Sequence, residues 1–381
     1  MGDPVVHHIK IANFKSIDTL KLNKVGCFSA FVGANGCGKS NFFDALDFVN
    51  RFIRRGVQDA LAAHGGYETI RCVKRYTGYS ERFEFEINCT LPLMEKKDAL
   101  TKRYNYRLKL HDLNKKAAIE EKLIVDGQCR LDRRWHGPFF IDNEEKAVDS
   151  FSPDNSGLLN FSNIPVVEFL RNIRLYRIEP KTASSEDRSD QSSYVLQNNG
   201  RNLPSVLKRL EKDKQLREEI SEWMEAVVPG LEKISTKQQA LTGNTEALFK
   251  ETGTGDPFPA RMVSDGTIFV LCLLVAVLDT PSQYGLAMIE EPERGLHPKA
   301  ISELINMIRE KSSTRNMVWL TSHSEPVVRQ LNLDEFWLVD KLNGRTQMKL
   351  GSDGNLKQDD LHPLGMDEAW LSNLLGGGLP W

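Results

Sequence analysis

The stretch FVGANGCGKS, residues 31–40, follows the pattern G-x-x-x-x-G-K-S and comes directly after an apolar run, residues 27–32. Glycines permit backbone conformations and close approaches that a Cβ atom would block, and the loop has three of them, Gly33, Gly36 and Gly38. Such a loop turns its N–H groups inward, and the N-terminus of a following helix adds a partial positive charge. The stretch therefore predicts a strand, a phosphate-binding loop and a helix. The alternative is an ordinary glycine-rich turn.

The side chains of this loop are suited to a nucleoside triphosphate with Mg²⁺. Lys39 would reach the β- and γ-phosphates, and the Ser40 hydroxyl would ligate the metal. The segment that follows, residues 41–55, has apolar side chains at helical spacing and ends in two arginines before Gly56, as helix C-termini often do. The residues that we expect to contact the nucleotide here are Gly33, Ala34, Asn35, Gly36, Cys37, Gly38, Lys39, Ser40 and Asn41.

Composition narrows the class of protein. The chain has 381 residues, enough for one large domain or two to three modest ones. Its 50 basic and 52 acidic residues argue against a broadly basic nucleic-acid binder. The longest apolar run, residues 268–278, is too short to span a bilayer, and the start of the chain has no signal-peptide pattern. Six scattered cysteines suit reduced thiols, so we expect a cytoplasmic protein without a membrane partner.

The patterning along the chain predicts a mixed α/β protein. Paired strands are expected over residues 7–32 and a small antiparallel sheet between about 80 and 130, with loops over 142–165 and 181–193. FLRNIRLYRI, residues 169–178, reads as a strand, and residues 202–228 read as helical. Near the end of the chain, two strands, residues 335–340 and 346–350, flank a turn at Asn343-Gly344.

A second candidate phosphate-binding element begins at residue 264. The residues Ser264-Asp265-Gly266-Thr267 precede a strongly apolar stretch that reads as a helix. A hydroxyl and a glycine N–H at a helix N-terminus can bind phosphate. The alternative is an ordinary cap on a buried helix.

Two further stretches place charged residues at the ends of apolar strands. Residues 286–289 lead into Glu290-Glu291, and residues 317–320 lead into Ser322-His323. Glu290 could hold Mg²⁺ through water, Glu291 could orient and deprotonate an attacking water, and His323 could sense a γ-phosphate. The alternatives are a solvated acidic pair and a structural histidine.

The order of these motifs resembles that of the ABC-type ATPases. Within them, the sequence is similar to the RecF and structural-maintenance-of-chromosomes (SMC) branch, and in particular to the compact bacterial AAA-15/AAA-21 ATPases, which also occur in anti-phage defence systems. The resemblance is carried by IKIANFKSID, FVGANGCGKSNFFDAL, RLYRIEP, LQNNGRNLPSVLKRL, VSDGT, MIEEPERGLHP and LTSHS.

The resemblance implies a role for each motif. Residues 33–40 become the Walker A loop, 264–267 the signature and 295–297 the D-loop. Glu290 matches the Walker B acid and Glu291 the catalytic glutamate, while Lys39 and His323, the switch histidine, complete the expected catalytic set. Two features depart from the family pattern. Glu290 stands where the family usually has Asp, and no Q-loop glutamine is evident, since Glu179, Gln191 and Gln197 are only approximate matches.

The implied fold is an ABC-ATPase head, a P-loop core with a mixed sheet and an antiparallel β lobe. A β-rich and then helical insertion would lie between Walker A and the signature. We expect an N-terminal lobe over residues 1–90, the insertion over 91–254 and a C-terminal lobe over 255–381.

The implied activity is hydrolysis of Mg·ATP by two heads that close on two nucleotides, in the service of a nucleic-acid or partner-protein task. One alternative is a regulatory subunit of a defence complex that restrains a nuclease or toxin in trans, since the segment after His323 is too short for a nuclease domain. A transporter ATPase is disfavoured by the β-rich insertion.

DNA remains a candidate ligand because of three basic clusters: Arg51, Arg54 and Arg55; Arg71, Lys74 and Arg75; and Arg130, Arg133 and Arg134. Solvated surface charge is the simpler explanation for each.

Overall fold

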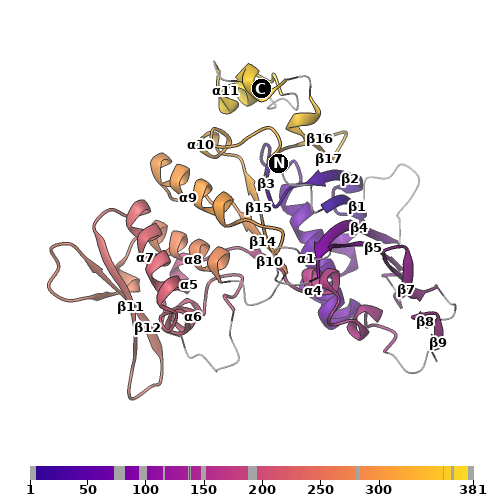
Figure 1. Ribbon diagram of the computed structural model, residues 1–381, viewed down its shortest axis with the longest axis horizontal. Helices are drawn as coiled ribbons and strands as arrows, with labels where there is room; N and C mark the ends of the chain where they lie inside the picture. The colour runs from indigo at the N-terminus through magenta and orange to yellow at the C-terminus, as the bar shows by residue number, and fades with distance from the viewer. Residues whose placement is uncertain are drawn as a thin grey trace.

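The computed structural model of the chain describes residues 6–72, 82–93, 101–114, 116–135, 137, 139–146, 152–187, 195–279, 284–354, 356–361 and 364–375. These residues form three sheets and the helices around them. Figure 1 shows strands β3, β14 and β15 in the middle, with the large antiparallel sheet on one side and the β11–β12 hairpin on the other. Among the described residues, no helix is long and apolar enough to cross a membrane.

The central sheet has six strands in the order β10-β14-β15-β3-β16-β17. Neighbouring strands within this sheet run parallel, except that β16 and β17 form an antiparallel hairpin around Asn343-Gly344. Because the carboxyl ends of parallel strands meet at one edge, this edge collects the residues that follow β3, β14 and β15. The strand bounds are β10 Ile173–Tyr176, β14 Gly285–Glu290, β15 Asn316–Ser322, β3 Phe28–Val32, β16 Phe336–Leu342 and β17 Arg345–Leu350.

The central sheet is buried on both faces. Alternate residues of β3 point to opposite sides, so Phe31 packs in one core while Ala30 and Val32 pack in the other. Helix α1 (Lys39–Arg55) contributes Phe42, Phe43 and other apolar residues to the first core. Helices α8 (Asp265–Leu278) and α9 (Pro298–Lys311) contribute to the second. α8 is apolar almost all round because other elements cover it.

The second sheet has eight antiparallel strands in the order β2-β1-β4-β5-β6-β7-β8-β9. It includes the small sheet predicted between about 80 and 130, but β3 is not part of it, although the sequence suggested that residues 7–32 pair together. The predicted boundary at residue 90 falls inside β4, which pairs with both β1 and β5. The strands are β1 Val6–Phe14, β2 Ile17–Val25, β4 Phe83–Pro92, β5 Thr101–His111, β6 Ala118–Val125, β7 Gln128–Arg133, β8 Phe139–Ile141 and β9 Glu144–Lys146.

The segment FLRNIRLYRI was predicted as one strand, and that prediction is wrong for its first residues. They end helix α4 (Pro165–Arg171), and only Ile173–Tyr176 form β10. Pro165 occupies the first helical turn, where its missing N–H costs nothing. The apolar residues that follow it are buried at helical spacing, which favours the helix.

The predicted helical stretch 202–228 is two helices, α6 (Leu203–Leu210) and α7 (Lys214–Val227). The Asp213 side chain accepts hydrogen bonds from the backbone N–H groups of Gln215 and Leu216, so it starts a new helix. The hairpin after α7 was not predicted. The remaining strands are β11 Leu231–Gln238, β12 Thr245–Glu251 and β13 Phe258–Pro259, and the remaining α-helices are α2 Val57–Ala63, α3 Tyr67–Ile70, α5 Pro180–Ala183, α10 Glu325–Val328 and α11 Met366–Leu371.

Candidate nucleotide site

The loop between β3 and α1 requires glycine at Gly33 and Gly38 because neighbouring strands pack closely against it. A Cβ atom on Gly33 would collide with the carbonyl oxygen of Val339 on β16. Gly38 has a φ of 110° and caps α1, and a Cβ atom there would collide with the Thr346 side chain on β17. The loop is therefore built against β16 and β17 as well as against its own helix.

Lys39 folds back into the loop. Its side chain is buried, and its Nζ donates to the carbonyl oxygens of Gly33 (2.5 Å) and Ala34 (2.9 Å). Cys37 lies beneath it, and burial raises the pKa of the Cys37 thiol, so this group stays neutral. Asn35, Gly36 and Ser40 are exposed. The loop thus carries one positive charge at its centre and presents backbone to the solvent.

Polar side chains from several segments hold the loop and the start of α1 in place by hydrogen bonds. Thr346 Oγ1 donates to the Cys37 carbonyl (2.9 Å) and lies 2.6 Å from Ser16 Oγ, which also accepts from Asn41 Nδ2 at 2.6 Å. Lys341 Nζ donates to the Gly36 carbonyl at 2.9 Å. Ser16, Lys341 and Thr346 were not singled out from the sequence, although Ser16 belongs to the quoted stretch IKIANFKSID.

The predicted base and the predicted sensor lie together. Glu291 follows the end of β14 with a φ of 50°, an uncommon value for a residue other than glycine, and its N–H donates to the Thr321 carbonyl on β15. Its carboxylate Oε1 lies 3.1 Å from Nδ1 of His323, and both side chains are 43% exposed. The pair is therefore accessible from solvent at the carboxyl edge of the central sheet.

A third carboxylate, Glu293, supports this pair and was missed in the sequence. Its Oε1 accepts from Ser322 Oγ at 2.7 Å and lies 3.9 Å from His323 Nδ1. The side chain is only 9% exposed, and burial raises the pKa of Glu293. The EPE pattern of residues 291–293 is the signal that could have pointed to it.

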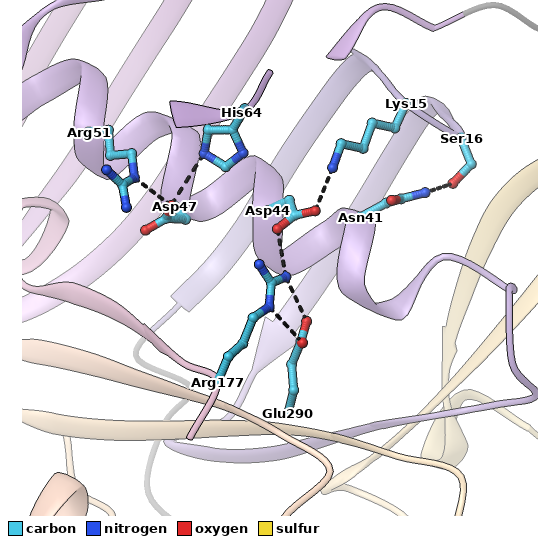
Figure 2. A network of polar contacts seen from close by, with 9 residues as sticks. All are labelled: Lys15, Ser16, Asn41, Asp44, Asp47, Arg51, His64, Arg177 and Glu290. Atoms are coloured by element: carbon cyan, nitrogen blue, oxygen red, sulfur yellow. Dashed lines mark hydrogen bonds and ion pairs between the residues drawn. The ribbon is translucent and has the colours of Figure 1, made fainter. Parts of the chain in front are cut away.

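Glu290 is tied to α1 by Arg177, which follows β10 (Figure 2). Arg177 donates to both carboxylate oxygens of Glu290, at 2.8 and 3.0 Å, and to Asp44 Oδ1 at 2.7 Å. Lys15 donates to the other oxygen of Asp44 at 2.5 Å. Burial opposes ionisation of Asp44, but these hydrogen bonds overcome it and hold its pKa below the usual range. The bonds to Glu290 are the main cause of the raised pKa of Arg177.

The residues present fit Mg²⁺ by their chemistry. Ser40 and Glu290 offer oxygen donors only, which is what this ion takes in proteins. Glu290 carries the expected charge, although both its oxygens are already bonded to Arg177. Within the described part of the chain, no group of three or more His, Cys, Asp or Glu side chains could hold a metal by itself. Mg²⁺ commonly relies on one or two side chains together with substrate phosphates.

Replacing Arg177 by alanine is expected to lower the free energy of unfolding by about 1–2 kcal/mol, because two largely buried carboxylates lose a shared partner. The estimate stays modest since Arg177 itself is 47% exposed and solvent screens part of its charge. Chemical denaturation measures the change. Adding Asp44→Asn to the variant should recover part of the loss, and an unchanged stability in Arg177→Ala would show that the network has no structural role.

The signature residues begin α8, which packs in the second core, whereas the loop 33–40 leads into α1 in the first core. Ser264 caps α8, where its Oγ accepts from the Thr267 N–H at 3.1 Å, and Ser264 and Asp265 are exposed. A Cβ atom on Gly266 would meet the Gly295 carbonyl oxygen, so the predicted signature and D-loop pack together. No hydrogen bond or ion pair between the described residues joins residues 264–266 to the loop 33–40.

Neither Glu179 nor Gln197, the approximate Q-loop matches, contacts Glu290 in the described part of the chain. Glu179 accepts from Thr182 Oγ1 at the start of α5, and the backbone N–H of Gln197 donates to Asn202. Gln191 lies outside the described residues. Among the described residues that follow β10, Arg177 contacts both Glu290 and Asp44 on α1, and sequence reasoning did not identify it.

The sequence matches a protein-family model over most of its length. Residues 28–329 match the AAA_21 family, described as "AAA domain, putative AbiEii toxin, Type IV TA system". No curated protein matches the chain by sequence.

Solved structures give the fold. The chain is similar to an SMC head bound to the C-terminal winged-helix domain of ScpA, with a TM-score of 0.58, 14% identity, and coverage of 91% of this chain and 97% of that one. It is also similar to an SMC head with an extended coiled coil from Pyrococcus furiosus, bound to the C-terminal domain of ScpA, with a TM-score of 0.55, 13% identity and coverage of 90% and 95%. The fold is therefore that of an ABC-ATPase head, as in the SMC heads, and the chain belongs to the AAA_21 family.

Proposed function

We propose that the protein hydrolyses Mg·ATP at a site shared between two copies of its head. The observation that carries this proposal is that the phosphate loop and the predicted signature lead into helices of two different cores, α1 and α8. Lys39 and the Glu291–His323 pair lie at the carboxyl edge of one sheet, whereas the exposed Ser264 has no hydrogen bond to the loop of its own head. A second copy can bring its Ser264 to that edge.

Each residue has a distinct task in this proposal. Lys39 and the loop N–H groups bind the phosphates, and Ser40 and Glu290 are the residues that would hold Mg²⁺. The ion, when bound, would neutralise charge that develops on the transferred phosphate. Glu291 accepts the proton of the attacking water, and His323 orients the Glu291 carboxylate from 3.1 Å. Ser264, Asp265 and Gly266 contact the phosphates bound to the other copy.

Binding of the phosphates at the loop requires a local rearrangement. Lys39 Nζ must exchange the carbonyls of Gly33 and Ala34 for phosphate oxygens. Glu290 must share its carboxylate between Arg177 and the metal's water shell. Because Arg177 also contacts Asp44 on α1, a change at Glu290 is transmitted to the helix that begins with Lys39.

Replacing Ser264 by arginine tests the shared site. The bulky cation should leave the loop around Lys39 intact but obstruct the second head. The variant should therefore bind ATP with unchanged affinity in isothermal titration and lose most of its turnover in a phosphate-release assay. The matched control is Asp256→Arg, at an exposed position between β12 and β13, and this variant should keep its turnover. Ordinary turnover in Ser264→Arg would mean that Ser264 only caps α8.

A second role, control of an effector in trans, is favoured by what the comparisons say of other proteins. The family description names a toxin of a type IV system, and the two SMC heads are bound to domains of ScpA. We infer that ATP-driven closure here controls a separate partner protein, in a defence or nucleic-acid task, in the cytoplasm. A pull-down from the native host with and without ATP tests this role, and a partner set that does not respond to ATP would contradict it.

A further inference from the structure

A second basic site lies at the other end of α1. A cavity of about 710 Å³ opens between α1, α4 and β10, and its lining includes five arginines. Three come from the last turns of α1, and two come from the end of α4 and from β10, far away in the sequence. We call this pocket the arginine cavity, and its arginines are Arg51, Arg54, Arg55, Arg171 and Arg174.

The positive charge of the cavity is only partly compensated. Two carboxylates, Asp47 and Glu168, face five guanidinium groups. Asp47 is already engaged by Arg51 at 2.8 Å and by His64 at 3.2 Å (Figure 2). Burial opposes ionisation of Asp47, but its contacts with His64 and Arg51 hold its pKa below the usual range, so it stays charged and paired. Outside the cavity lining, Asp59 lies 3.7 Å from Arg55.

Three of the arginines lack such a partner. Arg54, Arg171 and Arg174 form no ion pair with any carboxylate in the described part of the chain. Burial, followed by the charges of the neighbouring arginines, lowers the pKa of Arg54. Bringing like charges together costs free energy unless an anion joins them, and such a cluster is what an anion-binding site requires.

The arginines indicate a phosphate ligand. Guanidinium groups match the oxygens of phosphate with paired hydrogen bonds, better than ammonium groups do. Arg51, Arg54 and Arg55 have the i, i+3 and i+4 spacing of one helix face, opposite Arg171 and Arg174, so more than one phosphate can be held. The aromatic residue in the lining, Tyr176, is only 2% exposed and offers no surface for stacking a base.

We propose that the arginine cavity is a second phosphate-binding site, separate from the loop 33–40, for a ligand that carries two or more phosphate groups. The volume of about 710 Å³ is within the usual range of ligand pockets. Recognition is through phosphate and is independent of base identity. Two sources supply this chemistry, the backbone of a nucleic-acid strand and a free polyphosphate, and the experiment below separates them.

The test uses the full-length chain and the double variant Arg54→Gln/Arg171→Gln. The matched control is Lys233→Gln/Lys237→Gln, which removes the same charge from exposed positions on β11. A labelled single-stranded DNA of mixed sequence is titrated at several salt concentrations. Inorganic tripolyphosphate is titrated in a Lys39→Ala background, which removes phosphate binding at the loop. ATP titration and thermal melting of the double variant confirm its fold, and Arg174→Gln replaces it if it does not fold.

If the source is a nucleic acid, the double variant should bind the DNA at least about tenfold more weakly than the control. The slope of log affinity against log salt should fall by about 1.4, the value for two lost contacts to a single strand. If the source is a free polyphosphate, tripolyphosphate binding should fall in the double variant and DNA binding should not. The proposal is overturned if neither probe binds the unaltered cavity, or if both bind the double variant as well as the control.

Discussion

Replacing Lys39 by alanine is expected to remove ATP binding almost completely. Lys39 places the cation at the centre of the loop, where its Nζ lies within 2.5–2.9 Å of two loop carbonyls and can exchange them for phosphate oxygens. Truncating one partner of a buried charge pair costs about 2–5 kcal/mol. The loss of affinity in isothermal titration should therefore be between about 30-fold and a few thousand-fold.

Lys341→Ala is the matched control for Lys39→Ala. Lys341 also carries a positive charge near the loop, but its side chain is exposed and donates to the carbonyl oxygen of Gly36, an exposed loop residue. Its removal should change ATP affinity by less than about tenfold. Unchanged affinity in Lys39→Ala, or equal losses in both variants, would contradict the assignment of the loop.

Replacing Glu291 by glutamine is expected to lower turnover by on the order of 10²–10⁴-fold while ATP still binds. Glutamine keeps the shape of the side chain and its contact with His323, but it cannot accept the proton of the attacking water. Phosphate release under saturating ATP measures the loss, and titration confirms binding.

Glu310→Gln, on the exposed face of α9, is the control for Glu291→Gln and should keep full turnover. Glu290→Gln should behave differently from both. It removes charge from the Arg177 contact and from the expected metal site, so its main effect should be a weaker dependence of turnover on Mg²⁺ concentration. Equal and mild defects in Glu290→Gln and Glu291→Gln would show that the two roles are wrongly divided.

The site residues that could be predicted from the sequence all lie in short local motifs. The loop 33–40 follows β3, and the pairs Glu290-Glu291 and Ser322-His323 lie at the ends of β14 and β15. Parallel strands bring these ends to one edge. The close approach of His323 to Glu291 follows from that rule.

The residues that were missed depend on contacts between distant segments. Arg177 is separated from Glu290 by 113 positions, and Thr346 from Ser16 by 330. Arg177 lies in the quoted stretch RLYRIEP, but no spacing rule pairs it with Glu290, and Thr346 lies outside the quoted stretches. The arginine cavity has the same origin: Arg51, Arg54 and Arg55 were noted as a cluster, but only the packing of α4 and β10 against α1 adds Arg171 and Arg174.

The errors in secondary structure have a related cause. Residues 27–32 read correctly as a strand, but alternation of side chains does not say which strand it pairs with, and β3 lies between β15 and β16. In the segment FLRNIRLYRI, helix α4 and strand β10 adjoin with only Asn172 between them. Apolar and polar residues alternate irregularly across that boundary, and the apolar side chains of both elements are buried, so the pattern alone does not mark it.

The most direct test of the shared site is the molar mass of Glu291→Gln in solution, measured by light scattering with and without Mg·ATP. Slow turnover should trap the closed form, so the mass should double when ATP is added and should stay at its ATP-free value when Ser264→Arg is also present. An unchanged mass in Glu291→Gln, in a sample shown to have ATP bound, would contradict the proposal that two heads share the nucleotide.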